Sequence, residues 1–238
     1  MKIILALLTL IAALTTSGFA QQSITGNGQI IKQQRTLGSF NKLNVRVAMR
    51  VQITTGNAGT AELEGESNIL EHVVTEVRNG ELTVMLDQNK SYNQTKAVTV
   101  TIHVAKLDRV MVSTGCSVTA DLPILADNLT LSVETGSRLT APISAGKLNL
   151  TVKDGSAVTL NGKATDATIR LSGAGKLDAK RLTINKATVA LDGASNASIL
   201  VTETLAASAD GVSTITYGGN PTVTAAEATG LSRIRKQG

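Results

Sequence analysis

A repeated unit in the C-terminal half constrains the fold of this chain more than any other feature. Around each of six turn glycines, the last apolar residue before the turn lies six positions before the first apolar residue after it. These pairs are 112 and 118, 133 and 139, 152 and 158, 171 and 177, 191 and 197, and 209 and 215. Successive units are 21, 19, 19, 20 and 18 residues apart, whereas the internal spacing does not change. A constant internal spacing within a variable outer spacing indicates a structural repeat.

Each unit alternates apolar and polar residues, which predicts short strands joined by turns. The units have no helical half and lack the Leu-x-x-Leu-x-Leu signature of leucine-rich repeats, so stacked coils of strands remain. The chain is 42% hydrophobic but only 2% aromatic, so Val, Ile, Leu and Ala must fill the interior. Such side chains can stack at about 4.8 Å per coil. We therefore expect an all-β protein with a parallel β-helix of about 20-residue coils over 107–231.

The part before the repeats is β-rich but irregular. Strict alternation over 43–53 predicts one strand with one buried face, which the turn signal at Gly56-Asn57 ends. Further expected elements are strands at 60–64, 82–86 and 98–104, one or two helical turns at 67–74 and a tight turn at Asn79-Gly80. Stacked coils leave open strand edges at both ends. We expect a polar lead-in at 21–37, an N-terminal cap at 38–106, and a basic tail at 232–238 that blunts the other end.

The first twenty residues have the composition of an export signal. Lys2 precedes an apolar run over 3–14, and the small residues Gly18 and Ala20 stand before Gln21. The run is shorter than the roughly 20 residues that a membrane span needs. We expect a signal peptide over 1–20, a periplasmic or cell-surface location, and no membrane span in the mature chain.

Composition also bears on partners and on the lone thiol. The net charge of +5 is spread along the chain, and after the signal the aromatic residues are Phe40, Tyr92 and Tyr217, so a nucleic-acid partner is not expected. Cys116 follows Gly115, where matching turns carry Ser or Ala. We interpret it as a small turn residue, with intermolecular pairing or reactivity as the alternative.

Several motifs together resemble the bacterial head GIN domain family of autotransporter adhesins. They are Gly26-Asn27-Gly28 with Arg35, Phe40, Leu43 and Val45, then Asn68-Ile69-Leu70, Asn79-Gly80-Glu81-Leu82 and the Thr-Gly and Asp-Gly turns. The resemblance covers about residues 38–220. It implies an exported, right-handed β-helix related in shape to pectin lyases but without their catalytic residues. The chain departs from the family name in having no Gly-Ile-Asn tripeptide, the nearest being Thr183-Ile184-Asn185.

One column of side chains is the best candidate for chemistry. The residues directly before the six turn glycines are Thr114, Thr135, Asp154, Ser172, Asp192 and Asp210. If the coils stack in register, Asp192 and Asp210 lie one coil apart and could hold Ca²⁺ or form an acid/base pair. Asp, Ser and Thr before Gly also bond to their own turn backbone. Because that role explains all six members, we expect no metal site, no cofactor and no catalytic residue.

A nucleophilic site is not expected either. Ser156, Ser195 and Ser213 follow turn glycines, but a serine nucleophile needs a base within hydrogen-bond reach. The two histidines, His72 and His103, precede the repeats, and with one cysteine they do not form a spaced zinc ligand set. His103 is expected on the solvent face of its strand.

These features favour a non-catalytic exported β-helix that presents a long polar wall to a partner at the cell envelope. The partner would be an envelope protein or a polysaccharide, in an adhesin-like or scaffold role. The alternative is a polysaccharide lyase or hydrolase that uses Asp192 and Asp210. A third possibility is end-to-end self-association through uncapped strand edges.

Overall fold

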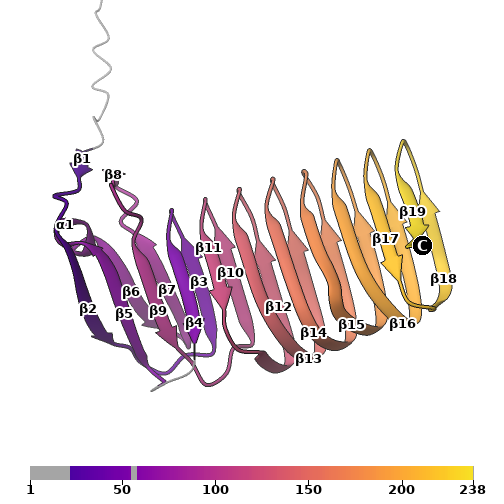
Figure 1. Ribbon diagram of the computed structural model, residues 1–238, viewed down its shortest axis with the longest axis horizontal. Helices are drawn as coiled ribbons and strands as arrows, with labels where there is room; N and C mark the ends of the chain where they lie inside the picture. Colours follow the sequence, from indigo (N-terminus) through magenta and orange to yellow (C-terminus); the bar gives the residue numbers. More distant parts are fainter. Residues whose placement is uncertain (1–21, 55–57, 238) are drawn as a thin grey trace, which may run out of the picture.

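The structure is a computed structural model that describes residues 22–54 and 58–237. Apart from one helical turn its elements are strands, which wind into a stack of coils (Figure 1). The expected signal peptide and the Gly56-Asn57 turn lie outside the described residues. The elements are β1 (Gln22–Thr25), β2 (Ile30–Thr36), β3 (Lys42–Arg46), β4 (Arg50–Thr54), β5 (Thr60–Glu66), α1 (Ser67–Leu70), β6 (Val73–Arg78), β7 (Glu81–Leu86), β8 (Lys90–Asn93), β9 (Thr99–His103), β10 (Arg109–Ser113), β11 (Ser117–Ala120), β12 (Ile124–Val133), β13 (Arg138–Val152), β14 (Ala157–Leu171), β15 (Lys176–Leu191), β16 (Asn196–Ala209), β17 (Thr214–Gly218), β18 (Thr222–Ala228) and β19 (Arg233–Lys236).

Each coil runs up one side of the stack to a tight turn and down the other side, and the turns line up along one edge (Figure 1). We call the strands before the turns the ascending sheet: β7, β3, β10, the second halves of β12 to β16, and β18. The strands after the turns form the descending sheet: β9, β4, β11, the first halves of β13 to β16, β17 and β19. Successive coils pair in parallel, which confirms the predicted β-helix.

The interior is built from stacked aliphatic side chains. Leu150 pairs in register with Ile169, which pairs with Val189, and all three are at most 1% exposed. Parallel, in-register stacking places each apolar residue on another one a coil away, so the core is a set of continuous columns. This is why the repeats can do without large aromatic rings.

The first coil begins earlier than the sequence analysis predicted. The expected single strand over 43–53 is two strands, β3 and β4, separated by a tight turn at Val47 and Ala48 with φ values of 61° and 54°. Val45 and Val51 are both buried, and they are six residues apart, as in the later coils. Alternation therefore runs through the turn unbroken, and no glycine marks it.

The tight turns change type along the stack. Thr114-Gly115, Thr135-Gly136, Asp154-Gly155 and Gly173-Ala174 have positive φ at both central residues, as in type I′ turns. In the later turns only Gly193, Gly211 and Gly230 have positive φ, as in type II′ turns, which place glycine first. The glycine therefore moves by one position within the turn between the early and the late coils.

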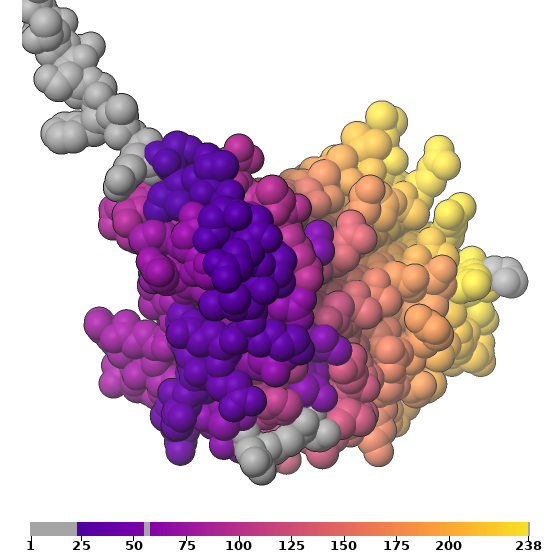
Figure 2. All heavy atoms as spheres, turned by 60° about the vertical axis from the view of Figure 1, so that its left-hand side comes forward, coloured from indigo at the N-terminus to yellow at the C-terminus, as the bar shows by residue number. Residues whose placement is uncertain are grey.

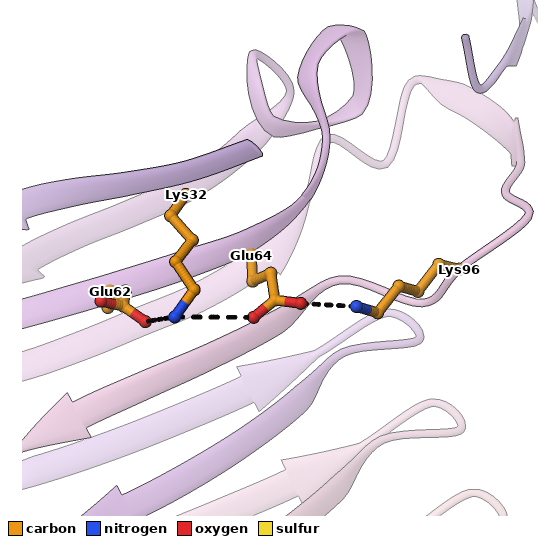
Figure 3. A network of polar contacts seen from close by, with 4 residues as sticks. All are labelled: Lys32, Glu62, Glu64 and Lys96. Atoms are coloured by element: carbon orange, nitrogen blue, oxygen red, sulfur yellow. Dashed lines mark hydrogen bonds and ion pairs between the residues drawn. The ribbon is translucent and has the colours of Figure 1, made fainter. Parts of the chain in front are cut away.

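The N-terminal region is β-rich and irregular, as predicted, and it lies at the near end of the molecule in Figure 2. Its strands form antiparallel pairs. β6 pairs with β7, and β2 and β5 extend the descending sheet from β9. On its outer surface, Lys32 Nζ lies 2.8 Å from Glu62 Oε1 and 3.9 Å from Glu64 Oε2, and Lys96 also bonds to Glu64 (Figure 3). Charges at this end of the sheet are therefore paired with one another.

A buried carboxylate ties the lead-in to this region. Glu66 is 0% exposed, and its carboxylate accepts hydrogen bonds from the backbone N–H groups of Gly28 and Thr95. A Cβ on Gly26 would lie about 2.1 Å from that carboxylate, so the lead-in needs glycine there. The helix has one turn, within the one or two turns expected: α1 ends at Leu70, and β6 begins at Val73.

The C-terminal end differs from the expected blunting tail. The charged tail forms β19, which pairs with β17 and belongs to the last coil. β18 pairs with β16, and all of its residues are exposed. The tail continues the strand alternation because Ile234 lies in register with Ile215 and follows the same inward column.

Candidate functional site

The prediction that the residues before the turn glycines share one column is only partly correct. Asp192 lies in register with Ser172 and Asp210, as predicted, because each directly follows the last buried residue of its ascending segment. Ser113, Glu134 and Lys153 hold the same place in the early coils. Thr114, Thr135 and Asp154 lie one position further on, since glycine is the second central residue of their turns and the first from Gly173 onward.

One oxygen of each carboxylate in the candidate pair accepts a hydrogen bond from its own turn or from the neighbouring one. Asp192 Oδ1 accepts a hydrogen bond of 2.5 Å from the backbone N–H of Gly193. Asp210 Oδ1 accepts one of 2.6 Å from Thr229 Oγ1, and this bond, with the N–H of Gly211, lowers the pKa of Asp210. Within residues 22–54 and 58–237, no cluster of three or more His, Cys, Asp or Glu side chains could hold a metal ion.

The serines after the turn glycines face the interior. Ser137, Ser156, Ser195 and Ser213 are at most 2% exposed. The hydroxyl of Ser156 accepts a hydrogen bond of 3.1 Å from the backbone N–H of Ser137, and Ser213 accepts one of 3.3 Å from Ser195. These hydroxyls therefore link one coil to the next, and they satisfy buried backbone groups.

The two histidines lie at the N-terminal end. His72 Nδ1 is 3.4 Å from Lys90 Nζ, and its ring centroid is 5.9 Å from that of Tyr92. His103 is partly exposed on β9, beside Thr60 of β5. Both belong to the capping region rather than to the repeat turns that carry the serines.

Cys116 takes the place of serine in the buried column. It is 2% exposed, and its Sγ accepts a hydrogen bond of 3.3 Å from the backbone N–H of Met49. Burial raises the pKa of the Cys116 thiol to about 11. The thiol form therefore predominates at neutral pH, and the side chain serves the turn, as the sequence indicated.

An apolar cavity of about 290 Å³ lies where the segment after β9 meets the turn after β11. Leu122 and Leu125 beside it are 45% and 58% exposed, and Lys106, at its rim, lies 3.5 Å from Asp108. Its other lining residues are Ile53, Thr54, Val104, Ala105, Leu107, Pro123 and Ile124. This cavity could not be found in the sequence, because its walls come from the end of β4, the segment after β9 and the start of β12, which are far apart in the chain.

The outer face of the descending sheet forms a regular polar surface. Two outward columns run along it from β4 to β19. The first consists of Arg50, Ser117, Arg138, Ala157, Lys176, Asn196, Thr214 and Arg233. The second consists of Gln52, Thr119, Thr140, Thr159, Asp178, Ser198, Thr216 and Arg235. We call them the basic column and the hydroxyl column.

Within the described part of the chain, none of the four cations of the basic column has a carboxylate within ion-pair distance. In the ascending sheet, acids stand in the same columns as cations, because Asp166 lies in register between Lys147 and Lys186, and Glu81 lies in register with Lys42. The four cations also follow one another without an acid in their own column. The sequence does contain a pattern that predicts the basic column, because its members stand at a constant offset after each turn.

Comparison with known proteins gives a family and a fold. The model of the family "Putative auto-transporter adhesin, head GIN domain" matches residues 39–221. A crystal structure described as a putative adhesin from Bacteroides fragilis has a TM-score of 0.85 at 22% identity and covers 90% of this chain and 100% of that one. No curated protein matches the chain.

Two further crystal structures share the fold. One, described as a putative adhesin from Parabacteroides merdae, has a TM-score of 0.75 at 17% identity and covers 91% of this chain and 100% of that one. The other, described as a putative lipid binding protein from Parabacteroides distasonis, has a TM-score of 0.72 at 16% identity with the same coverage. Among the described residues, no helix is long and apolar enough to cross a membrane.

Proposed function

Because the chain belongs to the head GIN domain family of auto-transporter adhesins, we propose that it is an exported, non-catalytic binding protein of the bacterial cell envelope. The export signal expected over 1–20 supports this location. The β-helix supplies a rigid, elongated body whose outward residues are free to contact a partner, while the inward ones hold the coils together.

The observation that carries the proposal is the descending face, where polar side chains lie in register from β4 to β19. Binding spread over such a face needs no enclosed cleft. A repeating surface suits a partner that is itself extended, since one contact can recur at each coil.

A lyase or hydrolase is supported less well. Asp192 and Asp210 do lie one coil apart, as that alternative requires. Each carboxylate, however, already accepts a hydrogen bond of its own turn or of the neighbouring one. These bonds give both carboxylates a role in the turns, and within the described ranges no third His, Cys, Asp or Glu side chain joins them in a metal-binding group, so we do not propose catalysis.

The apolar cavity beside Leu122 and Leu125 favours a second candidate function, the binding of an acyl chain. The description of the Parabacteroides distasonis structure as a putative lipid binding protein points the same way. Displacement of a fluorescent fatty acid from the purified protein, weakened in Leu125→Ser, would support it. Displacement that is unchanged in that variant would count against the cavity.

The main proposal is tested with isolated envelopes. The mature chain, beginning at Gln21, is labelled and mixed with washed bacterial envelope fractions, and the retained amount is measured against protein concentration. We expect saturable retention that unlabelled protein competes away. Retention that rises linearly, or that equals that of a protein of similar size and charge, would refute a binding role.

A further inference from the structure

The spacing of charge on the descending face has a period. Arg50 and Arg138 are two coils apart with Ser117 between them, and Arg138 and Lys176 are two coils apart with Ala157 between them. Strands in a sheet are about 4.8 Å apart, so these cations recur at about 10 Å. That distance is comparable with the length of a disaccharide in an extended glycan chain.

The residues between the cations are small, and the four cations are exposed. Ser117 and Ala157 do not reach as far as the neighbouring long side chains, so the space between the cations is open to a ligand. A cation without an internal partner keeps its full attraction for an external anion, and exposed cations along a groove or face add up for an extended polyanion.

The hydroxyl column lies directly beside this row of cations. Thr119, Thr140 and Thr159 occupy three successive coils, Asp178 follows them, and Ser198 and Thr216 continue the column. Hydroxyl groups both donate and accept hydrogen bonds, which suits the hydroxyl groups of a sugar. The face therefore offers cations to the acidic groups of a polysaccharide and, beside them, hydroxyl groups to its neutral groups.

A nucleic acid fits this face less well. Single strands bind on aromatic rings that stack against the bases. Among the described residues, Tyr217 is the one aromatic side chain on the strands of the descending sheet from β4 to β19, and it packs against the core. The face therefore recognises charge and hydroxyl groups without a platform for bases.

We propose that the descending face binds a linear polysaccharide that carries about one acidic group per disaccharide, with Arg50, Arg138 and Lys176 as its anion contacts at about 10 Å spacing. This inference rests on the proposed envelope-binding function and names its ligand class. The coil period sets the register of the bound chain, so the glycan lies along the axis of the β-helix.

The test uses hyaluronan oligosaccharides, which carry one carboxylate per disaccharide, and neutral cello-oligosaccharides as the ligand control. Affinity for the mature chain is measured by calorimetry over a series of salt concentrations. The variant R138S/K176S removes two cations and introduces the residue that already stands in the column at Ser117. The matched control R170S/K186S removes one Arg and one Lys from the ascending sheet, where both are exposed.

We expect hyaluronan to bind and cello-oligosaccharides not to bind. R138S/K176S should weaken binding about tenfold and flatten its salt dependence, since each exposed ion pair contributes a few-fold in affinity. R170S/K186S should change affinity less than threefold. Equal losses in the two variants would indicate attraction by net charge alone and overturn the inference, as would equal binding of single-stranded DNA or the absence of hyaluronan binding.

The same variants separate this inference from the proposed function. If R138S/K176S is retained on envelopes as well as the unsubstituted chain, the ligand assignment fails while envelope binding stands. If the unsubstituted chain is not retained at all, the proposed function fails. Thermal unfolding of both variants, expected near that of the unsubstituted chain, confirms that they fold.

Discussion

The buried serine column allows a quantitative test of how neighbouring coils are held together. Ser156 is 0% exposed, and its Oγ accepts a hydrogen bond of 3.1 Å from the backbone N–H of Ser137, which belongs to the preceding coil. Ser156→Ala removes the acceptor but keeps the packing of Cβ. The N–H of Ser137, itself in a 2% exposed residue, then loses its partner.

An unsatisfied buried N–H costs about 1–3 kcal/mol. The next coil shows how a buried N–H is satisfied when this hydroxyl is absent, because Gly175 stands there in the position of the serine. There, the N–H of Ser156 bonds to the carbonyl oxygen of Lys153 at 3.1 Å. The N–H of Ser137 can turn in the same way toward its own turn, so we expect a loss of about 1–2 kcal/mol, in the lower part of that range.

The assay is urea unfolding followed by circular dichroism, with hydrogen exchange of the Ser137 amide as the local probe. Ser198→Ala, on the outer face of the descending sheet, is the control and should change the free energy of unfolding by less than about 0.5 kcal/mol. If Ser156→Ala falls in the range of the control and leaves exchange at Ser137 unchanged, the hydroxyl does not link the coils and the reasoning is wrong.

Four further predictions follow from individual positions. Gly162→Ala should destabilise by more than about 2 kcal/mol in the same urea assay, because Gly162 has a φ of 108° and its Cβ would lie 2.1 Å from the carbonyl oxygen of Ile143; a neutral effect would contradict the backbone described there. Thr135→Asn should raise the melting temperature, since a β-branched residue at a φ of 55° costs about 1 kcal/mol or more; a lower melting temperature would speak against strain. Cys116, with its pKa raised to about 11, should react with iodoacetamide at pH 7.5 only in denaturant, and rapid labelling of the native chain would refute its burial. Burial would raise the pKa of Glu66, but hydrogen bonds from Gly28, Thr95 and Lys96 lower it below the ordinary 4.5. The ionised form therefore stabilises the fold above that pH, so Glu66→Gln should destabilise at pH 7 and progressively less as the pH falls below about 4.5, and an equal loss at every pH would contradict this.

Part of the candidate site was visible in the sequence. The pairing of Asp192 with Asp210 follows from spacing, since both stand one residue after a buried position at the same place in adjacent units. The other predicted members, Thr114, Thr135 and Asp154, were assigned by the glycine that follows them. That reference moves between Asp154-Gly155 and Gly173-Ala174, because both central residues of a type I′ turn have positive φ and glycine can stand at either one.

The turn at Val47 and Ala48 could not be recognised from local pattern. A strand and a tight turn of this kind give the same alternation of buried and exposed residues, as Val45, Met49 and Val51 show. Glycine is the usual mark of positive φ, and it is absent there. Pairing of β3 and β4 with the next coil holds the turn in place.

The sequence by itself determined that this chain winds into a β-helix, because a constant spacing of aliphatic residues around each turn leaves few other ways to bury them. Only the tertiary structure decided which outward residues share a column. Arg50 and Arg138 are 88 positions apart in the sequence and two coils apart in space, with β5 to β9 inserted between β4 and the next coil. Register between strands depends on turn type, bulges and inserted segments, so a surface made by stacking appears only when the coils are assembled.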